Sequence, residues 1–152
     1  MTKKLLFVVY ILIVGCTPDD ISRSYEESHA NRLLSKDDTK TWSLVSRIEN
    51  GNIVTSSCID NNTLTFVEAT DADSLYILGR SSDCVASDEI DTLYKANYTL
   101  DVDDLDVFQQ TITLSEEKHS GIGSFTVEHL TSGNLQLRYR EGRVRVEEQY
   151  SY

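Results

Sequence analysis

The residues with the clearest capacity for covalent chemistry are the three cysteines of the chain, Cys16, Cys58 and Cys84. A cysteine thiolate is a nucleophile that accepts a lipid group, pairs with a second thiol or binds a soft metal ion. Metal binding needs three or four Cys or His ligands at suitable spacing. The three histidines are scattered single residues, and neither Cys58 nor Cys84 has a Cys or His nearby. The spacing therefore favours lipidation or disulfide pairing over a metal site.

The N-terminal segment predicts export from the cytoplasm. Lys3 and Lys4 form a cationic start, and the ten residues that follow, 5–14, are apolar. Ten helical residues reach about 15 Å, which is half of the ~30 Å hydrocarbon core of a bilayer. The run therefore fits a signal peptide and is too short for a membrane span. We expect residues 1–15 to be removed from the mature protein.

Residues Ile13-Val14-Gly15-Cys16 resemble the lipobox of bacterial lipoproteins. In that motif, small residues fit the signal peptidase and the cysteine thiol accepts diacylglycerol. Two or three acyl chains on Cys16 would form a stable lipid anchor in the membrane. Asp19-Asp20 resembles the acidic signal that sends lipoproteins of Bacteroidetes to the outer face of the outer membrane. The alternative is an ordinary secretory signal in which Cys16 is incidental.

Cys58 and Cys84 are the thiols of the folded part of the chain. Exported bacterial domains meet oxidising conditions, where an even number of cysteines indicates pairing. We therefore expect a Cys58–Cys84 disulfide, with metal ligation as the competing interpretation.

The composition predicts one acidic, folded domain. The 152 residues include 14 Lys and Arg against 25 Asp and Glu, which gives a formal net charge of −11 at pH 7. Nucleic-acid binding needs clustered cations that displace counterions, so this charge excludes DNA or RNA as a partner. The hydrophobic fraction of 39% suffices for a core, and the length fits a single domain.

No motif in the sequence predicts catalysis. The chain lacks a Gly-x-Ser-x-Gly elbow, a phosphate-binding glycine loop and a His-Glu-x-x-His pair. Acidic residues are too plentiful between 60 and 106 to nominate a carboxylate pair for glycoside hydrolysis. We therefore expect no catalytic residue, no metal and no cofactor, with a glycan-active enzyme as the least favoured alternative.

The hydrophobic pattern changes once along the chain. Residues 16–40 are polar and predict a lipidated tether that ends in a short helix over Tyr25–Ser35. From Thr41 onward apolar residues alternate with polar ones, which is typical of strands with one buried face. Asn50-Gly51 and Glu141-Gly142 predict tight turns. The alternation marks eight strands, at Thr41–Glu49, Thr63–Val67, Ser74–Leu78, Leu93–Val102, Val107–Leu114, Ser124–Leu130, Asn134–Arg140 and Arg143–Tyr150.

Eight antiparallel strands over residues 41–152 predict an all-β barrel, because closure removes exposed strand edges. The first strand should place Trp42, Leu44 and Ile48 on its inner side. Large rings dominate the expected interior, which favours a filled barrel and recognition at its rim or loops. The candidate interior residues are Trp42, Phe66, Tyr98, Phe108, Phe125 and Tyr139, with Tyr150 beside them.

The order of these features resembles the lipocalin-like lipoproteins of Bacteroidetes. That family joins a lipobox and a short helix to an opening Lys-x-Trp-x-Leu strand, two cysteines and a Leu-x-Leu-x-Tyr strand. The matching residues are Lys40-Thr41-Trp42-Ser43-Leu44, Cys58, Asp60-Asn61-Asn62, Phe66, Cys84 and Leu135-Gln136-Leu137-Arg138-Tyr139. The resemblance covers residues 33–152 and implies an eight-stranded antiparallel up-and-down, lipocalin-like barrel. True lipocalins carry Gly-x-Trp where this chain has Lys40-Thr41-Trp42, so the chain resembles a calycin-like outgroup.

Four arginines near the C-terminus, Arg138, Arg140, Arg143 and Arg145, alternate with apolar residues and should line the outside of one hairpin. Such a row suits sulfated or uronic-acid glycans, or lipopolysaccharide phosphates. Cross-strand pairing with Glu147 and neighbouring acids is the favoured alternative.

Two short segments, Asp73-Ser74-Leu75 and Asp91-Thr92-Leu93, resemble the acceptor motif for O-glycans on exported Bacteroidetes proteins. The resemblance makes Ser74 and Thr92 candidate glycosylation sites.

These observations together predict a monomeric, lipid-anchored and non-catalytic protein on the surface of the outer membrane. Its barrel is expected to serve as a module for a small apolar ligand or for an envelope or host macromolecule. The alternatives are a purely structural envelope protein and an inhibitor of host lysozyme, since an acidic surface steers association with that basic enzyme.

Overall fold

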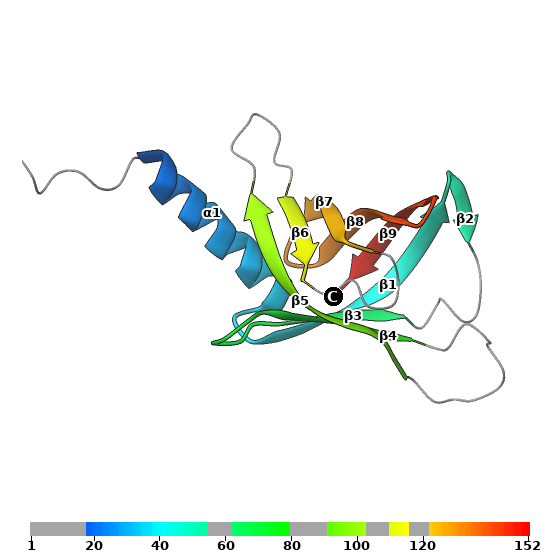
Figure 1. The fold of residues 1–152 in the computed structure, drawn as a ribbon, viewed down its shortest axis with the longest axis horizontal. Coiled ribbons are helices and arrows are strands. Elements are labelled where there is room, and N and C mark those ends of the chain that lie inside the picture. The colour runs from blue at the N-terminus through cyan, green and yellow to red at the C-terminus, as the bar shows by residue number, and fades with distance from the viewer. Residues whose placement is uncertain (1–17, 55–61, 80–90, 103–109, 116–121) are drawn as a thin grey trace, which may run out of the picture.

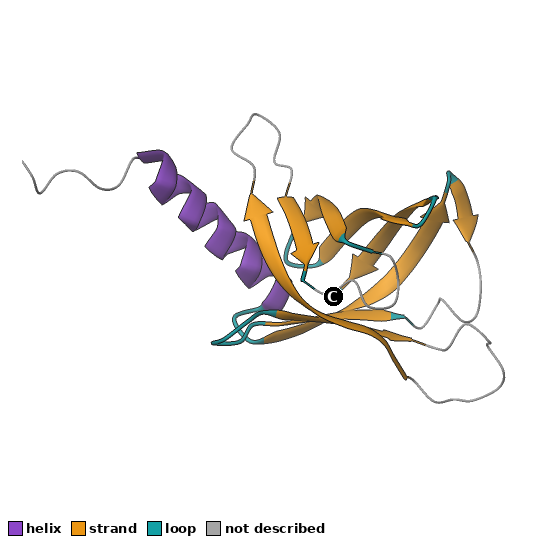
Figure 2. Cartoon of the chain, in the orientation of Figure 1, coloured by secondary structure: helices purple, strands orange, loops and turns teal. Residues whose placement is uncertain are grey.

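A computed structural model describes residues 18–54, 62–79, 91–102, 110–115 and 122–152. Within these residues, one helix precedes nine strands (Figures 1 and 2). The elements are α1 (Pro18–Ser35), β1 (Thr39–Glu49), β2 (Asn52–Val54), β3 (Thr63–Val67), β4 (Ser74–Gly79), β5 (Asp91–Val102), β6 (Gln110–Leu114), β7 (Ser124–Leu130), β8 (Asn134–Glu141) and β9 (Val144–Ser151). Within the described ranges, the structure has no helix with the length and hydropathy of a membrane span.

The strands form a closed antiparallel barrel. Each strand from β3 to β8 pairs with the next one along the chain, and β1 pairs with both β3 and β9. This arrangement confirms the predicted eight-stranded up-and-down barrel. The short strand β2 is an addition, and it pairs only with the end of β1. Asn50 and Gly51 join β1 to β2 with φ angles of 49° and 87°, so this predicted turn is also confirmed.

The helix begins earlier than the sequence analysis predicted. Residues 17–24 were expected to be tether, but α1 starts at Pro18. Pro18 and the two aspartates after it suit a helix N-terminus, because proline presets φ there and carboxylates favour the positive end of the helix dipole. Strand β1 likewise begins two residues early, at Thr39.

The last turn of α1 is attached to one end of the barrel by Lys40 and Trp42. The Trp42 indole donates a hydrogen bond to the Leu34 carbonyl at 3.1 Å. The buried Lys40 ammonium donates to the carbonyls of Leu33 at 2.8 Å and Ser132 at 2.9 Å, and it lies 3.7 Å from the centroid of the Trp42 ring. The bonds to Leu33 and Leu34 satisfy carbonyls that a helix end leaves unpaired, and the bond to Ser132 ties the helix end to the β7–β8 turn.

The two ends of the barrel carry different turns. The β7–β8 turn, which contains Ser132, lies at the helix end, because the Ser132 carbonyl accepts a hydrogen bond from Lys40. Strand β8 runs away from this end, so the β8–β9 turn lies at the opposite end, which we call the distal end. The β1–β2 turn joins it there, since Arg145 donates its backbone N–H to the Asn50 side chain at 3.0 Å (Figure 1).

Candidate functional site

Aromatic and aliphatic side chains fill the interior of the barrel. Trp42, Phe66 and Phe125 are at most 1% exposed. The rings of Phe66 and Tyr98 meet edge to face at 5.3 Å between centroids, and those of Phe125 and Tyr139 at 5.0 Å. Such contacts stabilise the fold beyond the contribution from burying the rings. The predicted interior positions Trp42, Phe66, Tyr98, Phe125, Tyr139 and Tyr150 are all buried, and Phe108 lies outside the described residues.

An ion-pair network occupies the distal part of the interior. The Arg47 guanidinium contacts three carboxylates, with Nε 2.7 Å from Glu49, Nη2 2.8 Å from Glu141 and Nη1 3.0 Å from Glu148. Its Nη1 also donates to the Tyr139 hydroxyl at 3.1 Å. Glu148 is buried, with 4% of its surface exposed. The network links β1 and β9, whose pairing closes the barrel, to the neighbouring strand β8.

The sequence pattern missed this network. Alternation from Trp42 predicted Ile48 inside, but the register between β1 and β9 shifts between Leu44 and Ser46. Val45 therefore bulges outward and is 64% exposed. Beyond the bulge Arg47 lies opposite the buried Glu148, and Ile48 moves to the outer side. No glycine or proline in this stretch signals the bulge.

Burial and charge both act on the groups of this network. Burial raises the pKa of Tyr150 well above its ordinary value, and the neighbouring Glu148, which accepts its hydroxyl hydrogen bond at 2.6 Å, raises it further. Burial and Glu148 raise the pKa of Tyr139 in the same way. Burial opposes the charge of Arg47, but its hydrogen-bonded neighbours outweigh this effect and raise the pKa of the guanidinium. The network therefore holds a cation against carboxylates and neutral tyrosines.

These tyrosines predict a loss of stability at alkaline pH. In the folded protein Tyr139 and Tyr150 keep their protons above the ordinary pKa of 10.0, near which the unfolded chain releases them. Above about pH 10 the unfolded state holds fewer protons, so the free energy of unfolding falls as pH rises, by up to about 1.4 kcal/mol per pH unit for each tyrosine. Urea unfolding between about pH 9 and pH 11 measures the slope. Tyr139→Phe should reduce it, and a flat profile would contradict the burial of these rings.

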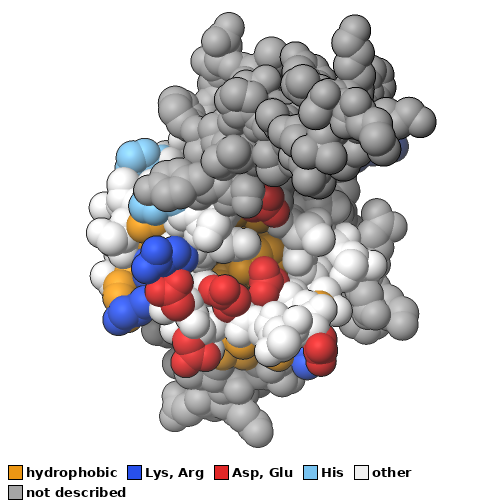
Figure 3. All heavy atoms as spheres, turned by 90° about the vertical axis from the view of Figure 1, so that its left-hand side faces the viewer, with side chains coloured by type: hydrophobic (Ala, Val, Ile, Leu, Met, Phe, Trp, Pro, Cys, Tyr) orange, Lys and Arg blue, Asp and Glu red, His pale blue; other side chains and the backbone are white. Residues whose placement is uncertain are grey.

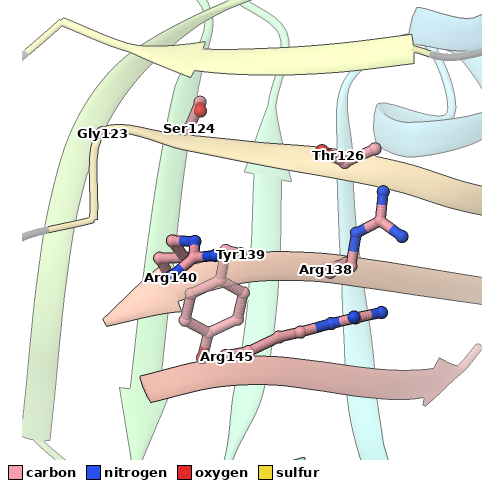
Figure 4. A pocket seen from close by; sticks show the side chains of 7 residues that line it. All are labelled: Gly123, Ser124, Thr126, Arg138, Tyr139, Arg140 and Arg145. Atoms are coloured by element: carbon pink, nitrogen blue, oxygen red, sulfur yellow. The ribbon is translucent and has the colours of Figure 1, made fainter. Parts of the chain in front are cut away.

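The outer wall of β7, β8 and β9 carries arginines (Figure 4). Arg138, Arg140 and Arg145 point outward, as predicted, and Arg140 lies directly opposite Arg145 in the β8–β9 register. They line a groove of about 440 Å³ together with Gly123, Ser124, Thr126 and Tyr139. Arg143 differs from the prediction, because it lies in the β8–β9 turn.

Two of these arginines are paired with acids, in line with the favoured alternative. Arg138 lies 2.7 Å from Glu128, and Arg145 lies 2.8 Å from Glu147. In the part of the chain that the structure describes, Arg140 has neither an ion pair nor a side-chain hydrogen bond, and it is exposed. Acidic pairing therefore accounts for Arg138 and Arg145 and leaves the charge of Arg140 uncompensated.

The helix end of the barrel carries acidic side chains, in contrast to the arginines of the outer wall. A hollow of about 550 Å³ beside α1 is lined by Glu27, Asp37 and Glu68 among others, and Figure 3 shows acidic side chains gathered on this face. A second hollow of about 470 Å³ contains Asn31 and Tyr98 in its lining. Within the described residues, the Asn31 Oδ1 atom and the Tyr98 hydroxyl are buried without a hydrogen-bond partner. Burial and the nearby Asp73 and Glu68 raise the pKa of Tyr98, so its hydroxyl stays neutral.

Replacing Tyr98 with phenylalanine should stabilise the fold. The change removes a buried hydroxyl that has no partner, so we expect the free energy of unfolding to rise by about 1 kcal/mol in urea titrations. Tyr150→Phe is the matched control, because its hydroxyl donates to Glu148 and its loss should destabilise the protein. A destabilised Tyr98→Phe variant would mean that this hydroxyl has a partner.

Of the remaining predicted site residues, the structure describes the two candidate glycosylation sites but not the three cysteines. Ser74 opens β4, is half-buried and donates its hydroxyl to the Asn97 side chain at 3.3 Å. Thr92 pairs with Leu78 between β5 and β4. Cys16, Cys58 and Cys84 lie outside the described residues. Among the residues that the structure does describe, no group of three or more His, Cys, Asp or Glu is arranged to hold a metal ion.

Comparison with known proteins yields no relative: no family model, no curated protein and no solved structure matches this chain. The function must therefore be argued from the site itself.

Proposed function

We propose that this protein is a lipid-anchored, non-catalytic binding module of the bacterial cell envelope, exposed on the outer membrane. It recognises its partner with the outer surface of the barrel. The observation that carries the proposal is the filled interior, in which buried rings and the Arg47 network occupy the space that a ligand would need.

A ligand inside the barrel would have to displace side chains that pack against one another. An apolar molecule inside the barrel would have to separate edge-to-face pairs such as Phe66–Tyr98. At the distal end it would also have to part Arg47 from the buried Glu148, which would leave charges without partners. Neither displacement is needed for recognition on the outer wall.

The placement of the helix supports recognition away from the membrane. Helix α1 reaches the barrel at the Trp42 end, and the proposed lipid at Cys16 precedes this helix in the chain. The distal turns β1–β2 and β8–β9 lie at the other end of the barrel. A chain anchored at Cys16 therefore presents its distal end to the surroundings of the cell.

Mass spectrometry of the full chain, purified from its native membrane in a neutral detergent, tests the proposal. We expect acyl chains on Cys16 and a native mass that is explained by the polypeptide and its covalent modifications alone. An unmodified Cys16 would overturn the anchor. A lipid or pigment that stays bound in stoichiometric amount would overturn recognition by the outer surface.

A further inference from the structure

We propose that the groove on the outer wall of β7–β9 is a binding site for a single phosphate or sulfate monoester on an otherwise neutral sugar. The site consists of Arg138, Arg140 and Arg145 with the hydroxyls of Ser124 and Thr126. This inference gives a ligand class to the outer-surface recognition proposed above, and it rests on that proposed function.

The groove gathers positive charge on an acidic chain. Arg140 and Arg145 occupy directly opposite positions in the β8–β9 register, where like charges are unfavourable, and Figure 4 shows the Arg145 side chain extending along β9 away from Arg140. The described lining of the groove contains no Asp or Glu. On a chain with a net charge of −11, this groove gathers three cations on one wall. Glu128 and Glu147 pair with Arg138 and Arg145, so an anion bound in the groove would compensate the remaining charge of Arg140.

The hydrogen-bond donors of the groove suit the oxygens of an anion. A guanidinium offers a planar fork of N–H groups, which matches the spacing of two oxygens on a phosphate or sulfate. Arg138 and Arg145 are held from one side by Glu128 and Glu147, so their orientation is supported. Figure 4 shows the Arg138 side chain reaching toward Thr126, with the Arg145 side chain extending along β9 below it. Ser124 and Thr126 add hydroxyl donors beside the guanidinium groups.

The net charge of the chain selects the molecule that carries the anion. The acidic surface of the rest of the chain repels a densely charged polymer, so a single anionic group on a neutral carrier is favoured. The groove is open to solvent, and a sugar attached to the anion can extend along the wall. Arg140 precedes the β8–β9 turn, far from the α1 attachment, which favours a sugar over the headgroups of the anchoring membrane.

Calorimetric titration of the full acylated chain in a neutral detergent tests the proposal. The probes are glucose 6-phosphate and glucose 6-sulfate, with glucose, inorganic phosphate and glycerol 3-phosphate as the neutral, free-ion and headgroup comparisons. We expect the two sugar esters to bind, and Arg140→Ala to weaken them about tenfold or more. Arg143→Ala removes the same charge from the adjacent turn, outside the groove, and should leave their affinity within about twofold of the parent value.

The results that would overturn the sugar-ester site differ from those that would overturn outer-surface recognition. Absence of ester binding, an equal loss in Arg143→Ala, or tighter binding of inorganic phosphate or glycerol 3-phosphate would each overturn it. Such failures would leave outer-surface recognition intact, since only an interior ligand in the mass spectrum contradicts that function. Arg140→Glu checks the fold: it should abolish ester binding while the melting temperature stays equal or rises, because a Glu–Arg pair replaces two facing arginines. A lowered melting temperature would contradict the repulsion on which the site rests.

Discussion

Replacing Arg47 with methionine is expected to lower the free energy of unfolding by about 3–5 kcal/mol. The methionine fills much of the same volume but leaves Glu148, which is only 4% exposed, as a buried charge without its cation. Tyr139 also loses the guanidinium that donates to its hydroxyl. Glu49 and Glu141 are more exposed, so water can solvate them after the change. Urea unfolding at neutral pH measures the loss.

A double variant separates the buried charge from the loss of packing. Arg47→Met combined with Glu148→Gln removes the unpaired charge, so it should recover part of the stability that Arg47→Met alone loses. Arg145→Met serves as the control, because its pair with Glu147 lies on the outer wall and should contribute about 1 kcal/mol or less. An Arg47→Met variant as stable as the control would show that the network does not hold the barrel closed.

Replacing Trp42 with alanine is expected to lower the free energy of unfolding by about 3–5 kcal/mol as well. The side chain is fully buried, so its removal leaves a cavity at the helix end of the barrel. The Leu34 carbonyl loses its indole donor, and Lys40 loses the ring beneath its ammonium. Both losses weaken the attachment of α1. Urea unfolding and protease cleavage within the helix should therefore respond together.

Two further substitutions serve as comparisons for the loss of stability in Trp42→Ala. Trp42→Phe keeps a ring but lacks the N–H, so it should fall between the parent and Trp42→Ala in stability. Val45→Ala changes an exposed residue of the same strand and should stay within about 0.5 kcal/mol of the parent. Equal effects of the Trp42→Ala and Val45→Ala substitutions would contradict the described burial of Trp42.

The barrel itself was predictable from the sequence. A period of two follows from the local geometry of a strand, so alternation located the strands without knowledge of their partners. Tight turns such as Asn50-Gly51 are also local, because the positive φ angles suit those residue types. The rings of Trp42 and Phe125 were placed inside for the same reason, and both are buried.

The start of the helix was less predictable. The polar composition of residues 17–24 suggested a tether, although α1 begins at Pro18. A helix that buries few side chains lacks the apolar periodicity by which a sequence predicts it. The described buried hydrophobic side chains of α1 are Ala30 and Leu34. Its attachment through Leu33 and Leu34 depends on Lys40 and Trp42, which lie beyond the end of the helix.

By itself, the sequence determined the strand pattern, the aromatic interior and the outward side of Arg138, Arg140 and Arg145, because these follow from alternation within one strand. Only the tertiary structure decided that Arg47 lies inside with Glu148 and that Arg140 faces Arg145. The bulge at Val45 arises from the pairing of β1 with β9, which are far apart in the chain. Its one-residue shift exchanges the two faces of a strand, and alternation within β1 carries no information about that partner.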